Sequence, residues 1–290
     1  MRRARPFILH PRTRHMQKQY RNVLVLSGCQ ATLQITGATM IAVTGLAGFA
    51  LAADKSLATV PLTSYVLGSA CTTIPASLFM RVVGRRAGFQ SGTALGILGS
   101  AVCSYAIVVA SFWLLCAGMF LMGCYTAFGK YYRFAAADAA QESFRAKAIS
   151  LTLAGGLFGG IFGPELAKYT RTASDYTYLG SYVSLGVVCL LAMLILTRLD
   201  IPQLSEQERS HSGRPLGEIM RQPVFIVAAL SSMLSYGIMN LMMTSTPLAM
   251  HAHEHHFDDA AFVLSWHMIG MYAPSFFTGS HWSSCCSCSV

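Results

Sequence analysis

The sequence predicts an all-α protein that crosses a membrane several times. Only 11% of its 290 residues are charged, against about 25% in an average soluble chain. Hydrophobic residues make up 53%, and the mean hydropathy is +0.48. The apolar residues also form runs of about 20, the length that crosses some 30 Å of hydrocarbon. These features exclude a soluble globular protein, and also a disordered chain, in which low hydrophobicity accompanies dense charge.

Eight runs are long and apolar enough to form membrane-spanning helices. The first has no charged residue between Arg21 and Asp54. It is therefore too long for the apolar core of a secretory signal peptide, and we expect it to remain in the membrane. We place the spans at residues 23–50, 58–80, 88–109, 112–134, 147–168, 176–197, 223–247 and 261–282.

The polar segments divide the chain into five parts. The predicted parts are a basic tail (1–22), a six-helix bundle (23–197), a central loop (198–222), two further helices (223–282) and a Ser/Cys-rich tail (283–290).

The distribution of lysines and arginines predicts the orientation in the membrane. All but three of the 21 basic residues fall on the side that holds the amino-terminal tail and the central loop. The exceptions are Lys55, Lys168 and Arg171. Short loops rich in lysine and arginine stay in the cytoplasm, so we expect both termini there. The basic excess then reflects topology and contact with membrane lipid, not nucleic acid.

Both ends of the chain have unusual compositions. Residues 1–15 are Arg-rich and could be a transit-like peptide, but we favour upstream sequence with Met16 as the start. The last eleven residues, SHWSSCCSCSV, differ from everything before them. We interpret them as an abnormal ending, such as a frame slip or a truncated product. Acylation or metal binding at Cys285, Cys286 and Cys288 is the alternative.

The region after the central loop begins like the start of the chain. Arg221 corresponds to Arg21, and Pro274 to Pro75, about 200 residues apart. We interpret this as the start of a second half that copies the first, as internal repeats do in transporters. Chance alignment of helical hairpins is the alternative.

The loop after the second span carries a family resemblance. Gly84, Arg85 and Arg86 match the end of the signature G-x-L-x-D-R-x-G-R-R, so that the chain resembles the major facilitator superfamily of bacterial secondary transporters. The resemblance implies a gating loop that pairs with the partner half. Arg81 stands where the signature has its aspartate, and it cannot accept the hydrogen bonds of that acid.

A second part of the resemblance lies in the fifth span. Gly159, Gly163 and Pro164 fit the G-x-x-x-G-P core of a motif found in exporters of this superfamily. Gly155 extends the spacing, and glycines four apart share one helix face, which lets a neighbouring helix approach closely. Pro164 loosens the helix beyond them. We expect a hinge that contributes to gating, with plain tight packing as the alternative.

Five polar residues are the candidate substrate-binding residues. The resemblance implies that the first, fourth, seventh and tenth helices line a central cavity. Pairs one turn apart share a helix face, and uncharged polar groups at this depth are costly unless they pair or line a wet cavity. Hydrogen bonding across a helix interface is the alternative. The candidates are Gln30, Gln34, Tyr125, Tyr236 and Asn240.

Few groups could carry a coupling proton. The proposed spans hold no aspartate or glutamate at mid-membrane depth. His267 is the only histidine well inside a span, and imidazole titrates near physiological pH. Glu165, near the outer surface, is the second candidate.

Other chemistry has little support. The loop at 251–259 is rich in His, Asp and Glu, but its spacing fits no closed tetrahedral zinc site. The sequence contains no G-x-S-x-G, Gly-Lys-Ser/Thr or H-E-x-x-H motif. We therefore expect no enzyme, no metal and no cofactor.

Together with these features, the resemblance implies a monomeric secondary transporter in a bacterial inner membrane. It would move a small organic solute by alternating access, driven by an ion gradient, with export favoured by Gly159, Gly163 and Pro164. The alternative is a truncated membrane remnant without transport activity.

Overall fold

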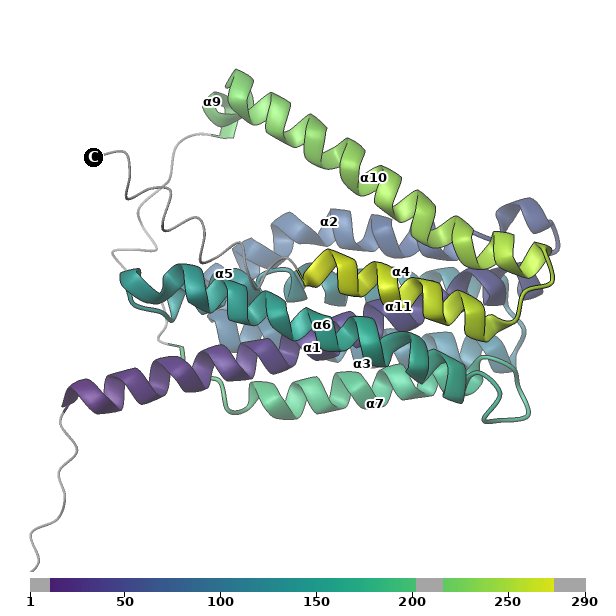
Figure 1. Ribbon diagram of the computed structural model, residues 1–290, viewed down its shortest axis with the longest axis horizontal. Coiled ribbons are helices and arrows are strands. Elements are labelled where there is room, and N and C mark those ends of the chain that lie inside the picture. Colours follow the sequence, from purple (N-terminus) through teal and green to yellow (C-terminus); the bar gives the residue numbers. More distant parts are fainter. Residues whose placement is uncertain (1–10, 202–215, 274–290) are drawn as a thin grey trace, which may run out of the picture.

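The computed structural model describes residues 11–201 and 216–273, and every regular element in these ranges is a helix (Figure 1). Two short 3-10 turns, Lys55–Leu57 and Glu142–Phe144, lie in the connections. The helices are α1 (Pro11–Leu51), α2 (Val60–Val83), α3 (Arg85–Val108), α4 (Phe112–Gly129), α5 (Tyr132–Asp138), α6 (Arg145–Thr170), α7 (Leu179–Leu196), α9 (Leu216–Met220), α10 (Pro223–Ala252) and α11 (Phe257–Tyr272).

Seven of the eight predicted spans correspond to segments long and apolar enough to cross a membrane. The eighth corresponds to α11, of which the structure describes 16 residues. The remainder of that span, Pro274 within it, and the tail at 283–290 with Cys285, Cys286 and Cys288 lie outside the described residues.

Three boundaries differ from the predicted ones. Helix α1 begins at Pro11, because lysine, glutamine and arginine are good helix formers and extend it through the stretch predicted as a tail. The fourth span breaks after Gly129 into α4 and α5. The predicted central loop contains the short helix α9.

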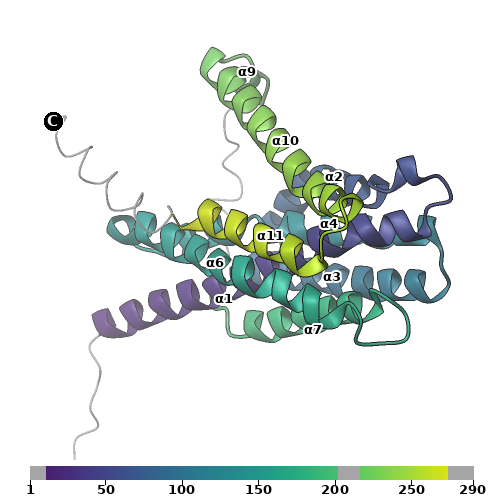
Figure 2. The ribbon, with the colours of Figure 1, turned by 45° about the vertical axis from the view of Figure 1, so that its right-hand side comes forward.

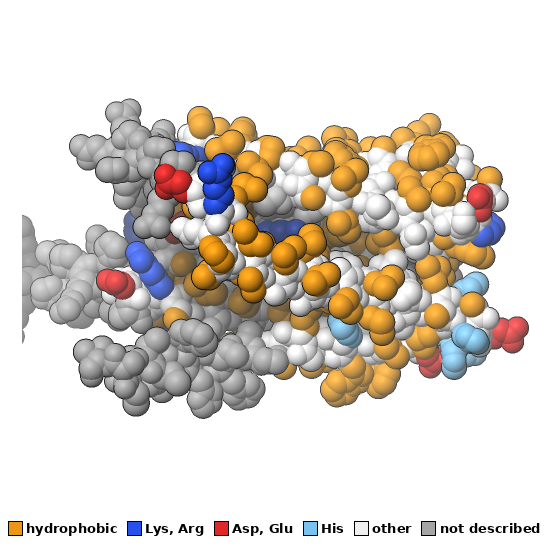
Figure 3. All heavy atoms as spheres, turned by 90° about the horizontal axis from the view of Figure 1, so that it is seen from above, with side chains coloured by type: hydrophobic (Ala, Val, Ile, Leu, Met, Phe, Trp, Pro, Cys, Tyr) orange, Lys and Arg blue, Asp and Glu red, His pale blue; other side chains and the backbone are white. Residues whose placement is uncertain are grey.

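Helix α1 lies at the centre of the bundle, with α6 and α7 packed along it (Figure 2). Helices α2 and α3 pack against α4, and α3 also contacts α7. The core between them is built from large buried side chains such as Leu26, Met40, Met119 and Leu185. Many large apolar side chains also face outward, as Figure 3 shows. An apolar outer surface fits a protein surrounded by lipid.

The predicted close approach at the glycines of the fifth span occurs against α1. A β-carbon at Gly155 would overlap the carbonyl oxygen of Ser27, and one at Gly159 would overlap the side chain of Gln34. A second glycine row, which the sequence reading missed, faces α11. A β-carbon at Gly160 would lie 2.7 Å from Met268 Cβ. Helix α6 therefore contacts α1 with one glycine row and α11 with the other.

Helices α2 and α3 are joined by a single residue, Gly84. Its φ of 91° and ψ of 159° lie in a region that is open essentially to glycine alone. This backbone conformation turns the chain directly from Val83 to Arg85.

We expect Gly84→Ala to destabilise the protein by about 1–3 kcal/mol, because a β-carbon is strained at this φ and ψ. The apparent midpoint of thermal unfolding in detergent measures the effect. Gly37→Ala is the matched control, since a β-carbon at Gly37 has no neighbour within 4 Å. Equal changes in the two variants would contradict the assignment of strain to Gly84.

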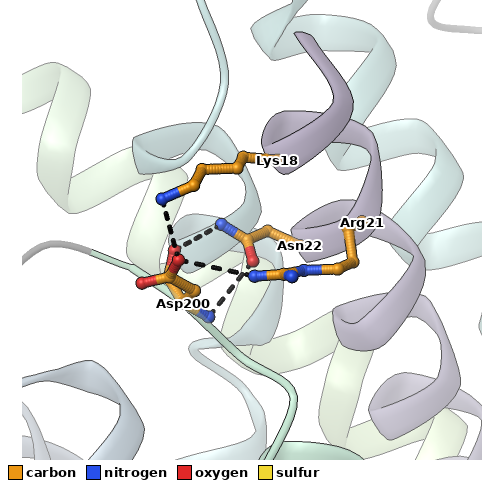
Figure 4. A network of polar contacts seen from close by, with 4 residues as sticks. All are labelled: Lys18, Arg21, Asn22 and Asp200. Atoms are coloured by element: carbon orange, nitrogen blue, oxygen red, sulfur yellow. Dashed lines mark hydrogen bonds and ion pairs between the residues drawn. The ribbon is translucent and has the colours of Figure 1, made fainter. Parts of the chain in front are cut away.

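A polar network ties the end of the six-helix bundle to α1 (Figure 4). The Asp200 carboxylate lies 3.2 Å from Lys18 Nζ and 3.4 Å from Arg21. Asn22 Nδ2 donates a hydrogen bond to the Asp200 carbonyl oxygen (2.7 Å), and its Oδ1 accepts one from the Asp200 backbone N–H (3.2 Å). The charged pairs are exposed and contribute little, so the amide contacts fix where the chain leaves α7.

Helix α10 packs against the bundle only through its second half. Residues 223–238 are all exposed, whereas Met243 and Pro247 are buried. Figures 1 and 2 show α10 diverging from the other helices toward the end that carries α9. We call this end, where Lys18, Arg21 and Arg85 also lie, the basic end.

Candidate solute-binding cavity

A cavity of about 390 Å³ lies between the six-helix bundle and the pair α10–α11. We call it the central cavity. Its volume falls in the range of small-molecule sites. The lining residues come mainly from α1, α10 and α11, so both parts of the chain contribute to its wall.

Helix α1 supplies two of the predicted amides. Gln30 and Gln34 both line the cavity, one turn apart as their spacing requires. Gln34 Nε2 donates a hydrogen bond to Tyr272 Oη of α11. A β-carbon at Gly156 would lie 2.8 Å from the Tyr272 ring, so that glycine leaves room for this tyrosine. The bond joins α1 to α11 across the cavity.

Helix α10 supplies Tyr236 and Asn240, which line the opposite wall. Asn240 Nδ2 donates to the Tyr236 carbonyl oxygen of the preceding turn (3.1 Å). Met239 and Met243 flank them on this wall. Methionine is flexible and polarisable, so this wall can adapt to the shape of a solute. The sequence reading missed the methionines, although their i, i+4 spacing matches that of Tyr236 and Asn240.

Tyr125 does not line the cavity, contrary to the prediction. It is 0% exposed, and a β-carbon at Gly96 of α3 would lie 2.9 Å from its ring. Its neighbour Thr126 lines the cavity and accepts a hydrogen bond from Tyr65 Oη (3.1 Å). Successive helical residues differ by about 100° in direction, so the one-residue shift turns the tyrosine into the core between helices.

We expect Tyr125→Phe to leave solute binding unchanged and the stability unchanged or slightly higher. Within the described part of the chain, its buried hydroxyl has no hydrogen-bond partner, and such a group costs free energy. Solute affinity and the thermal midpoint in detergent measure the two effects. Loss of affinity would restore Tyr125 as a binding residue.

Two basic residues in the cavity were predicted only as part of the charge excess on the cytoplasmic side. Lys130 and Arg133 both line it, beside the break between α4 and α5. Lys130 Nζ donates a hydrogen bond to Ser69 Oγ (2.9 Å) and lies 5.9 Å from the centroid of the Tyr236 ring. Figure 3 shows basic side chains in the hollow between apolar ridges. The signal that would have revealed them is their place inside the predicted fourth span, 112–134.

Neither candidate for proton coupling lies among the residues that line the cavity. His267 is exposed on α11, while the adjacent Met268 faces α6 and is buried. Glu165 is half-buried on α6, toward the end opposite the basic end. Their roles in coupling stay predictions.

The loop predicted to gate the transporter forms an ion pair inside the six-helix bundle. Arg85 lies 2.6 Å from the Asp138 carboxylate at the end of α5. The prediction had this loop pairing with the second half. Arg81 lines a separate pocket with Arg85 and Asp138, and Arg86 is exposed. The pair therefore joins the α2–α3 turn to α5.

The described residues contain no group of three His, Cys, Asp or Glu side chains that could hold a metal ion. His251, His255 and His256 line a pocket with Arg171 at the end opposite the basic end. Asp258 forms an ion pair with Lys168 (3.0 Å).

Comparison with known proteins identifies the family. The model of the Major Facilitator Superfamily matches residues 24–283. The chain belongs to this superfamily. The resemblance at Gly84, Arg85 and Arg86 is thereby confirmed at the level of the family, together with an all-helical, multi-pass membrane fold of the superfamily type.

Three relatives within the superfamily are bacterial transporters. The chain is 39% identical over 262 residues to a riboflavin transporter of Brucella anthropi, covering 89% of this chain and 66% of that protein. Two uncharacterized transporters of Bacillus subtilis are 26% and 27% identical, over 78% and 85% of this chain and 56% and 62% of their own lengths. The chain thus spans between about half and two thirds of these relatives.

Proposed function

We propose that this member of the superfamily moves a small organic solute across a bacterial inner membrane by alternating access, driven by an ion gradient. The observation that carries the proposal is the central cavity, whose wall combines Gln30 and Gln34 of α1 with Tyr236 and Asn240 of α10. Helices from both sides of the central loop meet there, and relative movement of such parts around a fixed site is how these transporters work.

The proposed solute is riboflavin or a similar planar heteroaromatic molecule. The relative with the highest identity given above bears the name of a riboflavin transporter. The cavity fits this chemistry, since Tyr65, Tyr236 and Tyr272 line it and offer ring faces for stacking. The amides of Gln30 and Asn240 offer both donors and acceptors to a polar heterocycle.

We further propose that the basic end faces the cytoplasm, which places the amino terminus inside the cell. Helix α10 diverges at this end (Figure 1), and its exposed first half leaves the cavity approachable from there. The structure then corresponds to an inward-open arrangement. We also propose that the protein acts as a monomer. The transport assay below measures the direction of net transport.

Two measurements on the 290-residue chain test this function separately. The first is saturable quenching of riboflavin fluorescence by the protein purified in dodecyl maltoside, with heat-unfolded protein as the control. The second is uptake or efflux of labelled riboflavin by riboflavin-auxotrophic bacteria that express the chain, against the empty vector. Absence of saturable quenching would contradict the flavin assignment. Binding with no movement of label would contradict transport and support the remnant alternative.

A further inference from the structure

We propose that the central cavity selects solutes that carry an oxyanion, a phosphate monoester or a carboxylate, and that Lys130 and Arg133 bind this group. The proposal rests on the proposed function, because it concerns the same cavity. It adds a requirement for negative charge on the solute, which the name of the riboflavin transporter of Brucella anthropi does not suggest.

The charges of the cavity wall are all of one sign. Among the described residues that line it, Lys130 and Arg133 are the charged ones, and none is an aspartate or glutamate. The ion pairs in residues 11–201 and 216–273 involve other cations: Lys18, Arg21, Arg85 and Lys168. Within these ranges, two positive charges thus face the cavity with no carboxylate among its lining residues.

Lys130 lies between α4 and α5, and both it and Arg133 are exposed. The apolar segment Phe112–Asp138 contains both residues. A charged side chain inside such a segment is unfavourable unless it is paired or lines a polar cavity. An oxyanion on the solute would supply the missing partner, and hydrogen bonds between charged groups are the strong ones.

Basic residues that only set the orientation of the protein in the membrane would point away from the cavity. Lysines and arginines at the membrane surface extend toward water and lipid head groups. Lys130 instead directs its ammonium group at Ser69, which is 4% exposed, and toward the Tyr236 ring. Arg133, in the first turn of α5, lines the same cavity. Both cations therefore lie on the cavity wall.

The remainder of the wall suits an aromatic anion better than an inorganic one. Tyr65, Tyr236 and Tyr272 offer ring faces, and Met239 and Met243 offer adaptable apolar contacts. Phosphate or carboxylate alone would leave this surface without a partner. A ring that bears one oxyanion fills both parts of the cavity.

The first test compares riboflavin with riboflavin 5′-phosphate by fluorescence quenching in dodecyl maltoside. We expect the phosphate ester to bind about tenfold more tightly at low ionic strength, the effect of one charge-assisted hydrogen bond. In the double variant K130Q/R133Q the preference should fall below about twofold, while K130R/R133K should keep it. K147Q, which removes a lysine that does not line the cavity, should match the wild type. Equal affinities in the wild type, or an undiminished preference in K130Q/R133Q, would overturn the proposal.

The second test needs no flavin. Phenyl phosphate and benzyl alcohol share a ring and differ in charge, and each is added to the purified chain during thermal unfolding. We expect phenyl phosphate alone to raise the midpoint, and K130Q/R133Q to lose the shift. If phenyl phosphate stabilises but neither flavin binds, the flavin function fails while the anion site stands. If phenyl phosphate has no effect, or if added phosphatidylglycerol stabilises and phenyl phosphate cannot compete with it, the proposal is overturned.

Discussion

Gly159→Ala is expected to lower the apparent midpoint of thermal unfolding, although alanine is the better helix former by about 1 kcal/mol. The reason is the contact between α6 and α1, where a β-carbon at Gly159 would overlap the side chain and backbone of Gln34. The helices would have to separate, and overpacking of this kind costs about 1–3 kcal/mol. Because Gln34 lines the central cavity, the affinity for the solute should fall as well.

Gly237→Ala is the matched control for this prediction. Gly237 also lies inside a helix, but a β-carbon there has no neighbour within 4 Å. Helix propensity alone then acts, so this variant should be as stable as the wild type or more stable. The same substitution should thus change stability in opposite directions at the two sites. A stabilising effect at Gly159 would contradict the close packing of α6 on α1.

Gln34→Leu is expected to weaken solute binding about tenfold, the effect of a lost hydrogen bond in a partly buried site. Leucine is similar in size but cannot donate to Tyr272 Oη, as Gln34 Nε2 does. The wall between α1 and α11 would lose the polar contact that joins them across the cavity. Fluorescence quenching with riboflavin or its phosphate measures the affinity.

Two further variants separate direct from indirect effects of Gln34. Tyr272→Phe removes the hydroxyl group that accepts the bond. If Gln34 acts through Tyr272 alone, this variant should match Gln34→Leu, and the double variant should add nothing. If Gln34 also contacts the solute, Gln34→Leu should cost more. Gln90→Leu, on α3 and outside the cavity lining, is the control. An effect of equal size at Gln90 would refute a specific role for Gln34.

Most of the fold could be predicted because the bilayer imposes a length on each apolar run. The glycine row at Gly155, Gly159 and Gly163 was also readable, since a spacing of four places residues on one face. The helix that packs against this row was not predictable, because residue spacing does not identify the neighbouring helix. The row at Gly156 and Gly160 has the same spacing of four, but the sequence analysis did not identify it.

The candidate site was predictable where pairs of residues define a face. Gln30 with Gln34, and Tyr236 with Asn240, line the same cavity. The position of Tyr125 was not predictable, because a single residue does not fix the rotation of a helix about its axis. Helix α4 directs Thr126, not Tyr125, toward the cavity. The position of Lys130 in the cavity was missed for another reason. Rules that count basic residues for topology do not distinguish a lysine in a loop from one that points into a cavity.

The second glycine row of α6 limits how α11 can move. Tyr272 rests at Gly156 and Met268 at Gly160, and both helices repeat about every 6 Å over four residues. A slide of one such repeat would bring Met268 to Gly156 and Leu264, also buried, to Gly160. At half that distance bulky side chains would meet bulky side chains. Any translation between the two helices would therefore occur in discrete register steps. Each step would end where a large side chain of α11 again packs against a glycine of α6.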